Sequence, residues 1–322
     1  MELMTKVDIK SSEKKIGYQD NILLLGSCFA DNIGEKFAEH YFQTTINPFG
    51  TLYNPASIAK TLTDTHYSLC DSQILHHNGM WHSMMHHGNF SHTDKAELLR
   101  NCEESRKRLS IALKKATTII VTFGTAWVYE MDGLVVANCH KLPAKEFVRR
   151  RMTVEEILSL WNPIIEQMPD KHWIFTVSPI RHIKDGLHAN QLSKAILLQA
   201  IDHLTSNSLS GLISNSVSGL TSNNLAVSYF PSYEIMMDEL RDYRFYAEDM
   251  VHPSQVAVNY IWERFVDTYI SADTQAEMRV LHQLWRDRHH RFLHPDSEEA
   301  RVFALRTEQK LHDLQQRYAW LK

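Results

Sequence analysis

Two short segments of the chain carry residues whose types and spacing suit covalent catalysis. The first holds Ser27 and Cys28, which follow an apolar run at residues 21–25 and lead into an amphipathic segment. A nucleophile on a tight turn between a strand and a helix is well placed, because the free amides of the helix N-terminus can hold an anion. The second segment holds Asp249 and His252, a carboxylate and an imidazole three residues apart, so that one can orient the other. We expect the two segments to form one site.

Residues 26–30 read GSCFA, and this pentapeptide looks like the signature of the GSCFA family, which resembles the GDSL or SGNH esterases. The resemblance covers about residues 15–268, given the usual length of a domain. In those esterases the nucleophile follows the first strand and an Asp-x-x-His motif closes the site; Asp249 and His252 match that motif. The resemblance implies ester hydrolysis or acyl transfer on a small-molecule or glycan ester, with no cofactor. A non-catalytic binding module that retains the fold is the alternative from another class.

Two adjacent residues compete for the role of nucleophile. A gap-free alignment through the following helix puts Cys28 at the position of the superfamily's nucleophilic serine, and a shift of one residue puts Ser27 there. The helix dipole would lower the pKa of a thiol at this place, and His252 would take its proton while Asp249 fixes the imidazole tautomer. A purely structural turn, with Cys28 buried and Ser27 capping the helix, is the alternative. We favour Cys28.

The donors of an oxyanion hole are marked less clearly. The resemblance assigns one to the backbone amide of residue 28 and one to Gly50, which follows the second expected strand; a turn glycine is the alternative. The superfamily's Gly-x-Asn motif falls on residues 124–126, which read GTA, so its asparagine is missing there. We expect Asn138, which follows a predicted hairpin, to substitute for it, and an ordinary surface residue is the alternative.

A histidine-rich segment raises the question of a metal site, because histidines four residues apart would share a helix face. Its members are His76, His77, His82, His86, His87 and His92. No carboxylate or cysteine accompanies them at ligand spacing, so we expect no metal. We expect a long polar loop over the substrate instead, with His82 and His87 in contact with it. Arg181 and His182 follow another expected strand and could hold an anionic group or form an ordinary surface pair.

Composition limits the class of protein. The chain has 322 residues, and 43% of them are hydrophobic, which is ample for a packed core. Its net charge of -4 leaves no electrostatic footprint for nucleic acid or for an anionic membrane. No apolar signal core and no run of about 18 apolar residues occurs, so we expect no membrane segment and a cytoplasmic location. The 4 cysteines form no CxxC pair, which fits free thiols in a reducing compartment.

Apolar runs alternate with amphipathic segments, which predicts an α/β fold with a parallel sheet; the resemblance specifies a doubly wound sheet of the flavodoxin-like, SGNH type. Strands are expected at residues 21–25, 42–47, 117–123, 172–177 and 226–230. Helices are expected at residues 31–40, 55–63, 96–115, 154–167, 192–204 and 254–270. Asp132 and Gly133 predict a hairpin. Residues 64–94 and 205–224 read as loops.

The last part of the chain is almost wholly helix-forming, with one break at residues 294–296. We expect residues 1–270 to form the α/β domain and residues 271–322 to form two helices packed on it. Apolar residues at helical spacing give these helices faces too large to leave in water. We therefore expect the extension to stabilise the domain or a homodimer rather than to take part in the chemistry.

Overall fold

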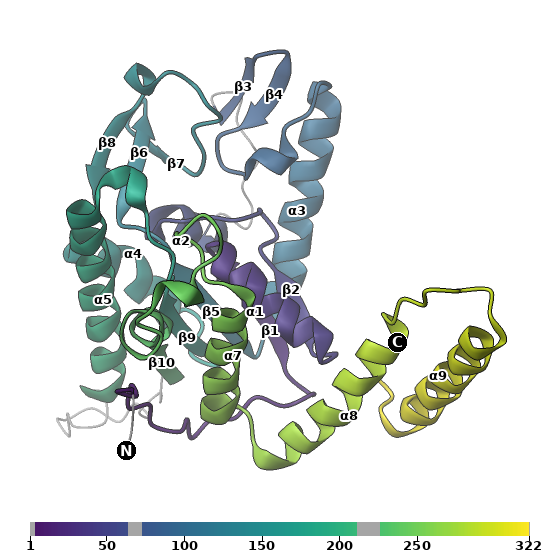
Figure 1. Ribbon diagram of the computed structural model, residues 1–322. Helices are drawn as coiled ribbons and strands as arrows, with labels where there is room; N and C mark the ends of the chain where they lie inside the picture. The colour runs from purple at the N-terminus through teal and green to yellow at the C-terminus, as the bar shows by residue number, and fades with distance from the viewer. Residues whose placement is uncertain (1–3, 64–72, 211–225, 322) are drawn as a thin grey trace.

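The computed structural model describes residues 4–63, 73–210 and 226–321, with the backbone alone for residues 207–210. A five-stranded parallel sheet lies at its centre, with helices packed around it (Figure 1). The strands are β1 (Asn21–Gly26), β2 (Gln43–Ile46), β5 (Thr118–Phe123), β9 (His172–Val177) and β10 (Ala226–Phe230). They run in the order β10-β9-β5-β1-β2, the flavodoxin-like order in which the second strand flanks the first. The predicted α/β fold is confirmed.

The inner strands β1, β5 and β9 are mainly apolar on both faces because both of their faces are covered. Every residue of β5 and β9 is buried. Successive side chains of a strand point to opposite faces, so Ile22 and Leu24 enter one apolar cluster while Leu23 and Leu25 enter the other. A continuous apolar run is what a parallel strand between two helical layers requires.

Helices α1 and α7 contribute to the first apolar cluster, and α2, α3, α4 and α5 contribute to the second. Their bounds are Cys28–Glu39 (α1), Pro55–Thr63 (α2), Lys95–Lys115 (α3), Val154–Glu166 (α4), Leu187–Ser210 (α5) and Gln255–Tyr269 (α7), and a single turn, α6, spans Ser232–Glu234. Two starts differ from the predictions by more than one residue. α1 begins at Cys28 because Ser27 caps it, and α5 begins at Leu187 because Gly186, with φ 86°, makes the preceding turn.

Two small antiparallel sheets stand beyond one end of the central sheet (Figure 1). They comprise β3 (Ile74–His77) with β4 (Met80–Ser83), and β6 (Trp127–Met131) with β7 (Leu134–Val136) and β8 (Val148–Arg151). The predicted hairpin turn is confirmed, with φ of 52° at Asp132 and 76° at Gly133. The predicted loop is wrong for residues 74–83, which form β3 and β4, and its residues 64–72 lie outside the described residues. β8 was not predicted.

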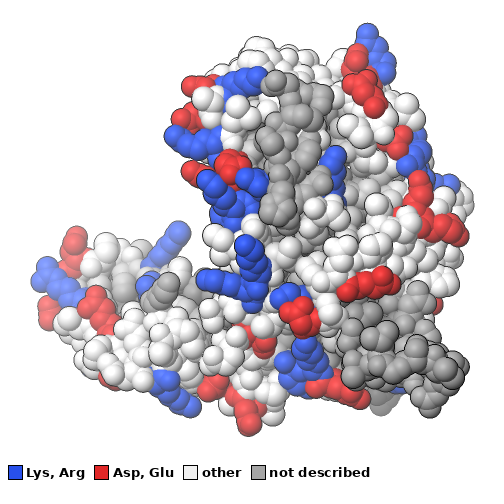
Figure 2. Space-filling model, turned by 180° about the vertical axis from the view of Figure 1, so that it is seen from behind, with Lys and Arg blue, Asp and Glu red and all other residues white. Residues whose placement is uncertain are grey.

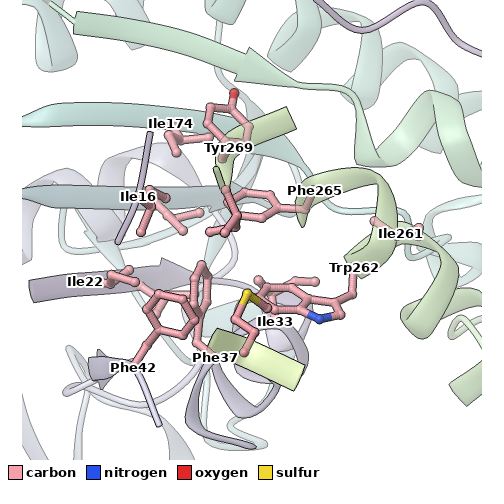
Figure 3. Close-up of a cluster of buried hydrophobic side chains, with 14 of the residues drawn as sticks. Ile16, Ile22, Ile33, Phe37, Phe42, Ile174, Ile261, Trp262, Phe265 and Tyr269 are labelled. Atoms are coloured by element: carbon pink, nitrogen blue, oxygen red, sulfur yellow. The ribbon is translucent and has the colours of Figure 1, made fainter. Parts of the chain in front are cut away.

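An aromatic cluster joins α1 and α7 to the sheet (Figure 3). The ring of Phe37 packs edge-on against Trp262 and Phe265, with ring centroids 4.8 Å and 5.6 Å apart. Phe265 packs edge-on against Phe230 of β10, with centroids 5.1 Å apart. Each such pair adds about 0.5–1.5 kcal/mol to what apolar burial supplies. Because α7 directly follows the segment that carries His252, this cluster also fixes where that segment lies.

Two further helices, α8 (Ala272–Arg288) and α9 (Glu298–Arg317), form the predicted pair at the end of the chain. α8 buries Met278, Leu281 and Leu284, and α9 buries Ala300 and Leu314. From behind, the pair projects from the body, with basic and acidic side chains interspersed on that face (Figure 2). Among the described helices, none is long and apolar enough to span a membrane.

Replacing Phe265 tests the role of the aromatic cluster. Phe265→Ala should lower the free energy of unfolding by about 3–5 kcal/mol, because it removes a ring that is 2% exposed. Val256→Ala on the same helix, at a side chain that is 64% exposed, should change it by less than about 0.5 kcal/mol. Urea titration measures both, and equal losses for the two variants would contradict the packing described.

Candidate active site

Strand β1 ends in a backbone contact that only glycine permits. Gly26 has φ +131°, and a Cβ atom there would lie 2.1 Å from the carbonyl oxygen of Thr122 on β5. The next amide, Ser27 N, donates to the same oxygen at 3.1 Å, and Gly26 N donates to Asn47 Oδ1 at 2.8 Å. The strand order reverses between β1 and β5, which is where open α/β sheets bind ligands. The turn after Gly26 is therefore fixed at the switch point of the sheet.

The two candidate nucleophiles lie in different surroundings. Ser27 is 1% exposed, and its Oγ accepts a hydrogen bond from Phe29 N at 3.3 Å, as the N-cap of α1. Cys28 is the first residue of the helix, is partly exposed and lines a cavity of about 660 Å³. The serine hydroxyl is thus used by the helix end, while the thiol faces the cavity.

The cavity lies where the predicted site residues were expected to meet. It is bounded by the segments that follow β1, β5 and β9, by the β6–β8 sheet, and by the segment before α7. The predicted residues that line it are Cys28, His87, Asn138, Arg181, His182, Asp249 and His252. Ser27, Gly50 and His82 do not line it. The structure therefore brings one nucleophile candidate to the imidazole and carboxylate.

Asp249 and His252 form a hydrogen-bonded pair. His252 Nδ1 donates to Asp249 Oδ2 at 2.5 Å, and the other carboxylate oxygen accepts from the amides of Val251 and His252, both at 2.9 Å. These bonds, first those from the backbone and side chain of His252, lower the pKa of Asp249 to about 2. An ionised Asp249 keeps the proton on Nδ1, so Nε2 is left to accept one.

Arg181 holds the segment that carries this pair. Its guanidinium donates to the carbonyl of Met250, its backbone amide donates to Val251 O at 3.4 Å, and it lies 4.3 Å from the ring of Tyr246. Met250 has φ 57°, a conformation that non-glycine residues adopt only when their surroundings enforce it. Arg181 thus supports the loop, which is a different role from the predicted contact with an anion.

The Cys28 thiol is protonated in this arrangement. Burial, and secondarily the charge of Asp31, raises its pKa to about 11, although the amides of α1 and the charge of Lys194 act in the opposite direction. The helix end acts in the expected direction, but burial outweighs it, so the net shift is upward and the expected low pKa is not found. Within the described chain the thiol makes no hydrogen bond to His252.

The two expected oxyanion donors, Gly50 and Asn138, differ in whether their N–H groups already have acceptors. Gly50 N already donates to Asn47 O at 2.7 Å, so the assignment of Gly50 as a donor is wrong. Glycine stands there because its φ is +76° and because any Cβ atom at this position would lie 2.3 Å from the Cβ of His87. Asn138 lines the cavity, and its Oδ1 accepts from His140 N at 2.9 Å, which leaves Nδ2 without a partner in the described chain.

The histidines separate into wall residues and packed residues. His82 is 9% exposed, and its ring nitrogens contact Ser91 Oγ at 2.7 Å and His77 O at 3.2 Å, so its assignment to substrate is wrong. His87 and His182 line the cavity, and burial lowers the pKa of His182 to about 4. Within the described residues, no group of three or more histidine, cysteine or acidic side chains is arranged to hold a metal.

Some residues of the site were missed in the sequence. Trp127 and Arg149 form one wall, where the guanidinium lies 3.9 Å over the indole and pairs with Asp185. Lys194 is wholly buried behind the strand ends. The sequence marks only that Lys194 shares a helical face with the apolar Leu197 three residues later, and this pattern does not name the groups that Lys194 binds.

Comparison with known proteins identifies one family. The sequence model of the GSCFA family matches residues 21–265, which include both Cys28 and the Asp249–His252 pair. No curated protein and no solved structure matches the chain.

Gly26→Ala tests the contact at the switch point. It should lower the free energy of unfolding by about 3 kcal/mol or more, since the added atom meets backbone and the φ is unsuited to alanine. Gly17→Ala is the control, because its added Cβ would lie 3.8 Å from the nearest atom, Thr274 Oγ1. Denaturant titration of both variants should separate them, and similar values would show that the β1–β5 contact is not restrictive.

The pH dependence of Cys28 alkylation tests the state of the thiol. With a pKa of about 11, the thiolate fraction grows with pH, so the iodoacetamide rate should still be rising at pH 10. Peptide mass spectrometry resolves Cys28 from Cys70, Cys102 and Cys139. A rate that levels off near pH 8 would mean that the thiol ionises far more readily than its burial implies.

Proposed function

The chain belongs to the GSCFA family, and we propose that it cleaves ester bonds through an acyl-enzyme formed on Cys28. One observation carries this proposal: Cys28 shares a cavity with the hydrogen-bonded Asp249–His252 pair, while the Ser27 hydroxyl caps α1. Nucleophile, base and orienting carboxylate are the three parts that acyl transfer through a covalent intermediate requires.

Acylation begins when His252 Nε2 takes the proton of the Cys28 thiol. The thiolate attacks the acyl carbon, and the bond to the alcohol oxygen breaks as His252 returns the proton to that oxygen. Asp249 accepts from Nδ1 throughout and stabilises the imidazolium that forms between the two proton transfers. The products of this half-reaction are an alcohol and a thioester on Cys28.

Deacylation repeats these steps with water. His252 takes a proton from water, the hydroxide attacks the thioester carbon, and the thiolate leaves and regains its proton from the imidazolium. The acid is released and the free thiol is restored. The backbone amide at the start of α1 and Asn138 Nδ2 are the donors we assign to the tetrahedral oxyanion, since the first amides of a helix lack intrahelical acceptors.

The cavity suits a small-molecule or glycan ester. Its volume of about 660 Å³ lies within the range of ligand pockets, and Tyr53, Trp127 and Tyr129 give it aromatic walls. Arg149 and Lys184 at its edge add donors for oxygen-rich groups. These features support O-acyl groups on polar molecules as substrates.

Transfer of the acyl group follows the same steps, except that an acceptor alcohol takes the place of water in deacylation. A binding module without catalysis is the second candidate, and one observation favours it: the thiol is protonated and is not hydrogen-bonded to His252 in the described structure. Kinetics of active-site variants separate the candidates.

Hydrolysis of p-nitrophenyl acetate tests the proposal. Cys28→Ala should lower kcat/KM by about 10³-fold or more, and Asp249→Asn by about 10²–10⁴-fold, because the first removes the nucleophile and the second the imidazole's orienting acceptor. Addition of an acceptor alcohol then shows, from the ratio of ester to acid formed, whether transfer competes with hydrolysis.

Ser27→Ala is the matched control. It should lower stability by about 1 kcal/mol through loss of the helix cap, yet retain most of the activity. Full activity in Cys28→Ala with none in Ser27→Ala would identify the serine as the nucleophile. Equal, low activity in every variant and in the parent would favour the binding module.

A further inference from the structure

A buried lysine joins two strand ends behind the cavity. The side chain of Lys194 on α5 is 0% exposed, and its Nζ donates to Gly124 O and Ser178 O, both at 2.7 Å. These are the first residues after β5 and β9. Lys194 therefore ties together the two segments that lead into the cavity wall.

Neighbouring residues of α5 strengthen this tie. Ser193 Oγ accepts from Ala126 N at 2.8 Å and bonds to the Thr125 hydroxyl at 3.0 Å, and Asn190 Oδ1 accepts from His182 N at 3.0 Å. Thr125 and His182 both line the cavity. Helix α5 thus holds both segments of the cavity wall. The hydrogen bonds of Ser193 and Asn190 do this with neutral side chains.

A charged group is not needed merely to hold two carbonyls. Burying an ammonium costs several kcal/mol unless an anion compensates it. Within the described residues no carboxylate pairs with Lys194, whose two acceptors are neutral. A buried cation without a structural counter-ion, next to a reactive group, is typical of a functional site.

The anion that this cation can face is the thiolate of Cys28. Gly124, whose carbonyl binds Lys194, packs against the turn before Cys28, since a Cβ at Gly124 would lie 3.4 Å from Ser27 Cβ. Lys194 and Cys28 also interact electrostatically, each favouring the charged form of the other. Through Gly124, the buried cation is thus linked to the turn that carries the nucleophile.

We propose that Lys194 is a positioning residue that places a buried positive charge behind Cys28 and thereby stabilises its thiolate. The inference rests on the proposed function, because it assigns Lys194 to the nucleophile named there. It explains how a buried thiol can be activated although the helix end alone does not suffice. His252 removes the proton, and Lys194 stabilises the charge that is left.

Other groups face this pair and enter any pH profile. Asp31 on α1 opposes thiolate formation, and Tyr53 also interacts with Cys28. Around Lys194 lie His182 and the ring of Tyr233, the latter 5.6 Å from Nζ. His182 has a pKa of about 4 and stays neutral above pH 6. His252, which lines the same cavity, is present in the parent and in the Lys194 variants alike, so its effect cancels from the ratio of their rates.

The test compares thiol reactivity in the parent chain and in Lys194→Gln at several pH values. Burial lowers the pKa of Lys194 to about 7, so the parent carries the charge at pH 6 and has largely lost it by pH 9. At pH 6, methyl methanethiosulfonate should therefore modify Cys28 about tenfold faster in the parent than in Lys194→Gln, which corresponds to a difference of about one unit in the pKa of the thiol. At pH 9 the two rates should be nearly equal. Peptide mass spectrometry gives the rate for Cys28 alone.

Two further variants separate charge from tethering. Lys194→Met removes both the charge and the hydrogen bonds, and the ratio of the parent's rate to its rate should depend on pH as it does for Lys194→Gln. Ser193→Ala should lower stability, but the ratio of the parent's rate to its rate should be the same at every pH. Equal rates for the parent and Lys194→Gln at pH 6, or a ratio that is the same at every pH, would overturn the proposal. These rates need no turnover, so this inference and the proposed function can fail separately.

A second measurement applies where the Lys194 variants do not fold. By reciprocity, a permanent anion at position 28 must favour the charged lysine. The Lys194 side chain, followed by carbon NMR, should titrate at least about one pH unit higher in Cys28→Asp than in Cys28→Ala. Equal midpoints would overturn the proposal, because the two groups would then not interact.

Discussion

The arrangement depends on the close approach of β1 to β5 at Gly26. A side chain at this position would collide with the carbonyl of Thr122, so the chain can turn here only at a glycine. The turn sets the direction of the next two side chains: Ser27 points into the helix cap, and Cys28 starts α1 at the edge of the cavity. Backbone geometry thus decides which of the two candidate nucleophiles reaches the cavity.

Opposing electrostatic effects act on the pKa of the Cys28 thiol. Burial and Asp31 keep the thiol protonated, while the helix amides and Lys194 favour the thiolate. The Asp249–His252 pair, by contrast, is about half exposed, with side chains 49% and 48% accessible, and it stands on a loop held by Arg181. In the mechanism that we propose, the buried thiol is the acid and the half-exposed imidazole is the base, and the charge left on the thiolate is shielded from water.

Local patterns in the sequence predicted much of the fold. β9 and β10 have the predicted bounds, and the turn at Asp132 and Gly133 forms as expected, because buried strands and tight turns are encoded by neighbouring residues. A similar turn signal, Asn78-Gly79, joins β3 to β4, but the polar histidines around it favour a loop over a hairpin. β8 is charged and short, and only its pairing with β6 makes it a strand.

Sequence motifs predicted only part of the site. Asp249, His252 and Cys28 stood out by type and spacing. The use of the Gly50 amide by Asn47 is a local turn bond that the turn signal at residues 47–50 already implied, whereas the burial of His82 depends on the fold around it. Lys194 was missed for the same reason, since its two acceptors lie 70 and 16 residues away in the chain. Contacts between distant segments, rather than propensities, decide the role of each polar side chain.

Trapping the acyl-enzyme tests the central claim most directly. The protein is mixed with an activated acetyl ester, quenched in acid within the first turnover and digested, and the peptide that carries residues 27 and 28 is analysed by mass. The account predicts an acetyl group on Cys28 that neutral hydroxylamine removes, as it does from a thioester. An acetyl group on Ser27, or turnover without any adduct on this peptide, would contradict it.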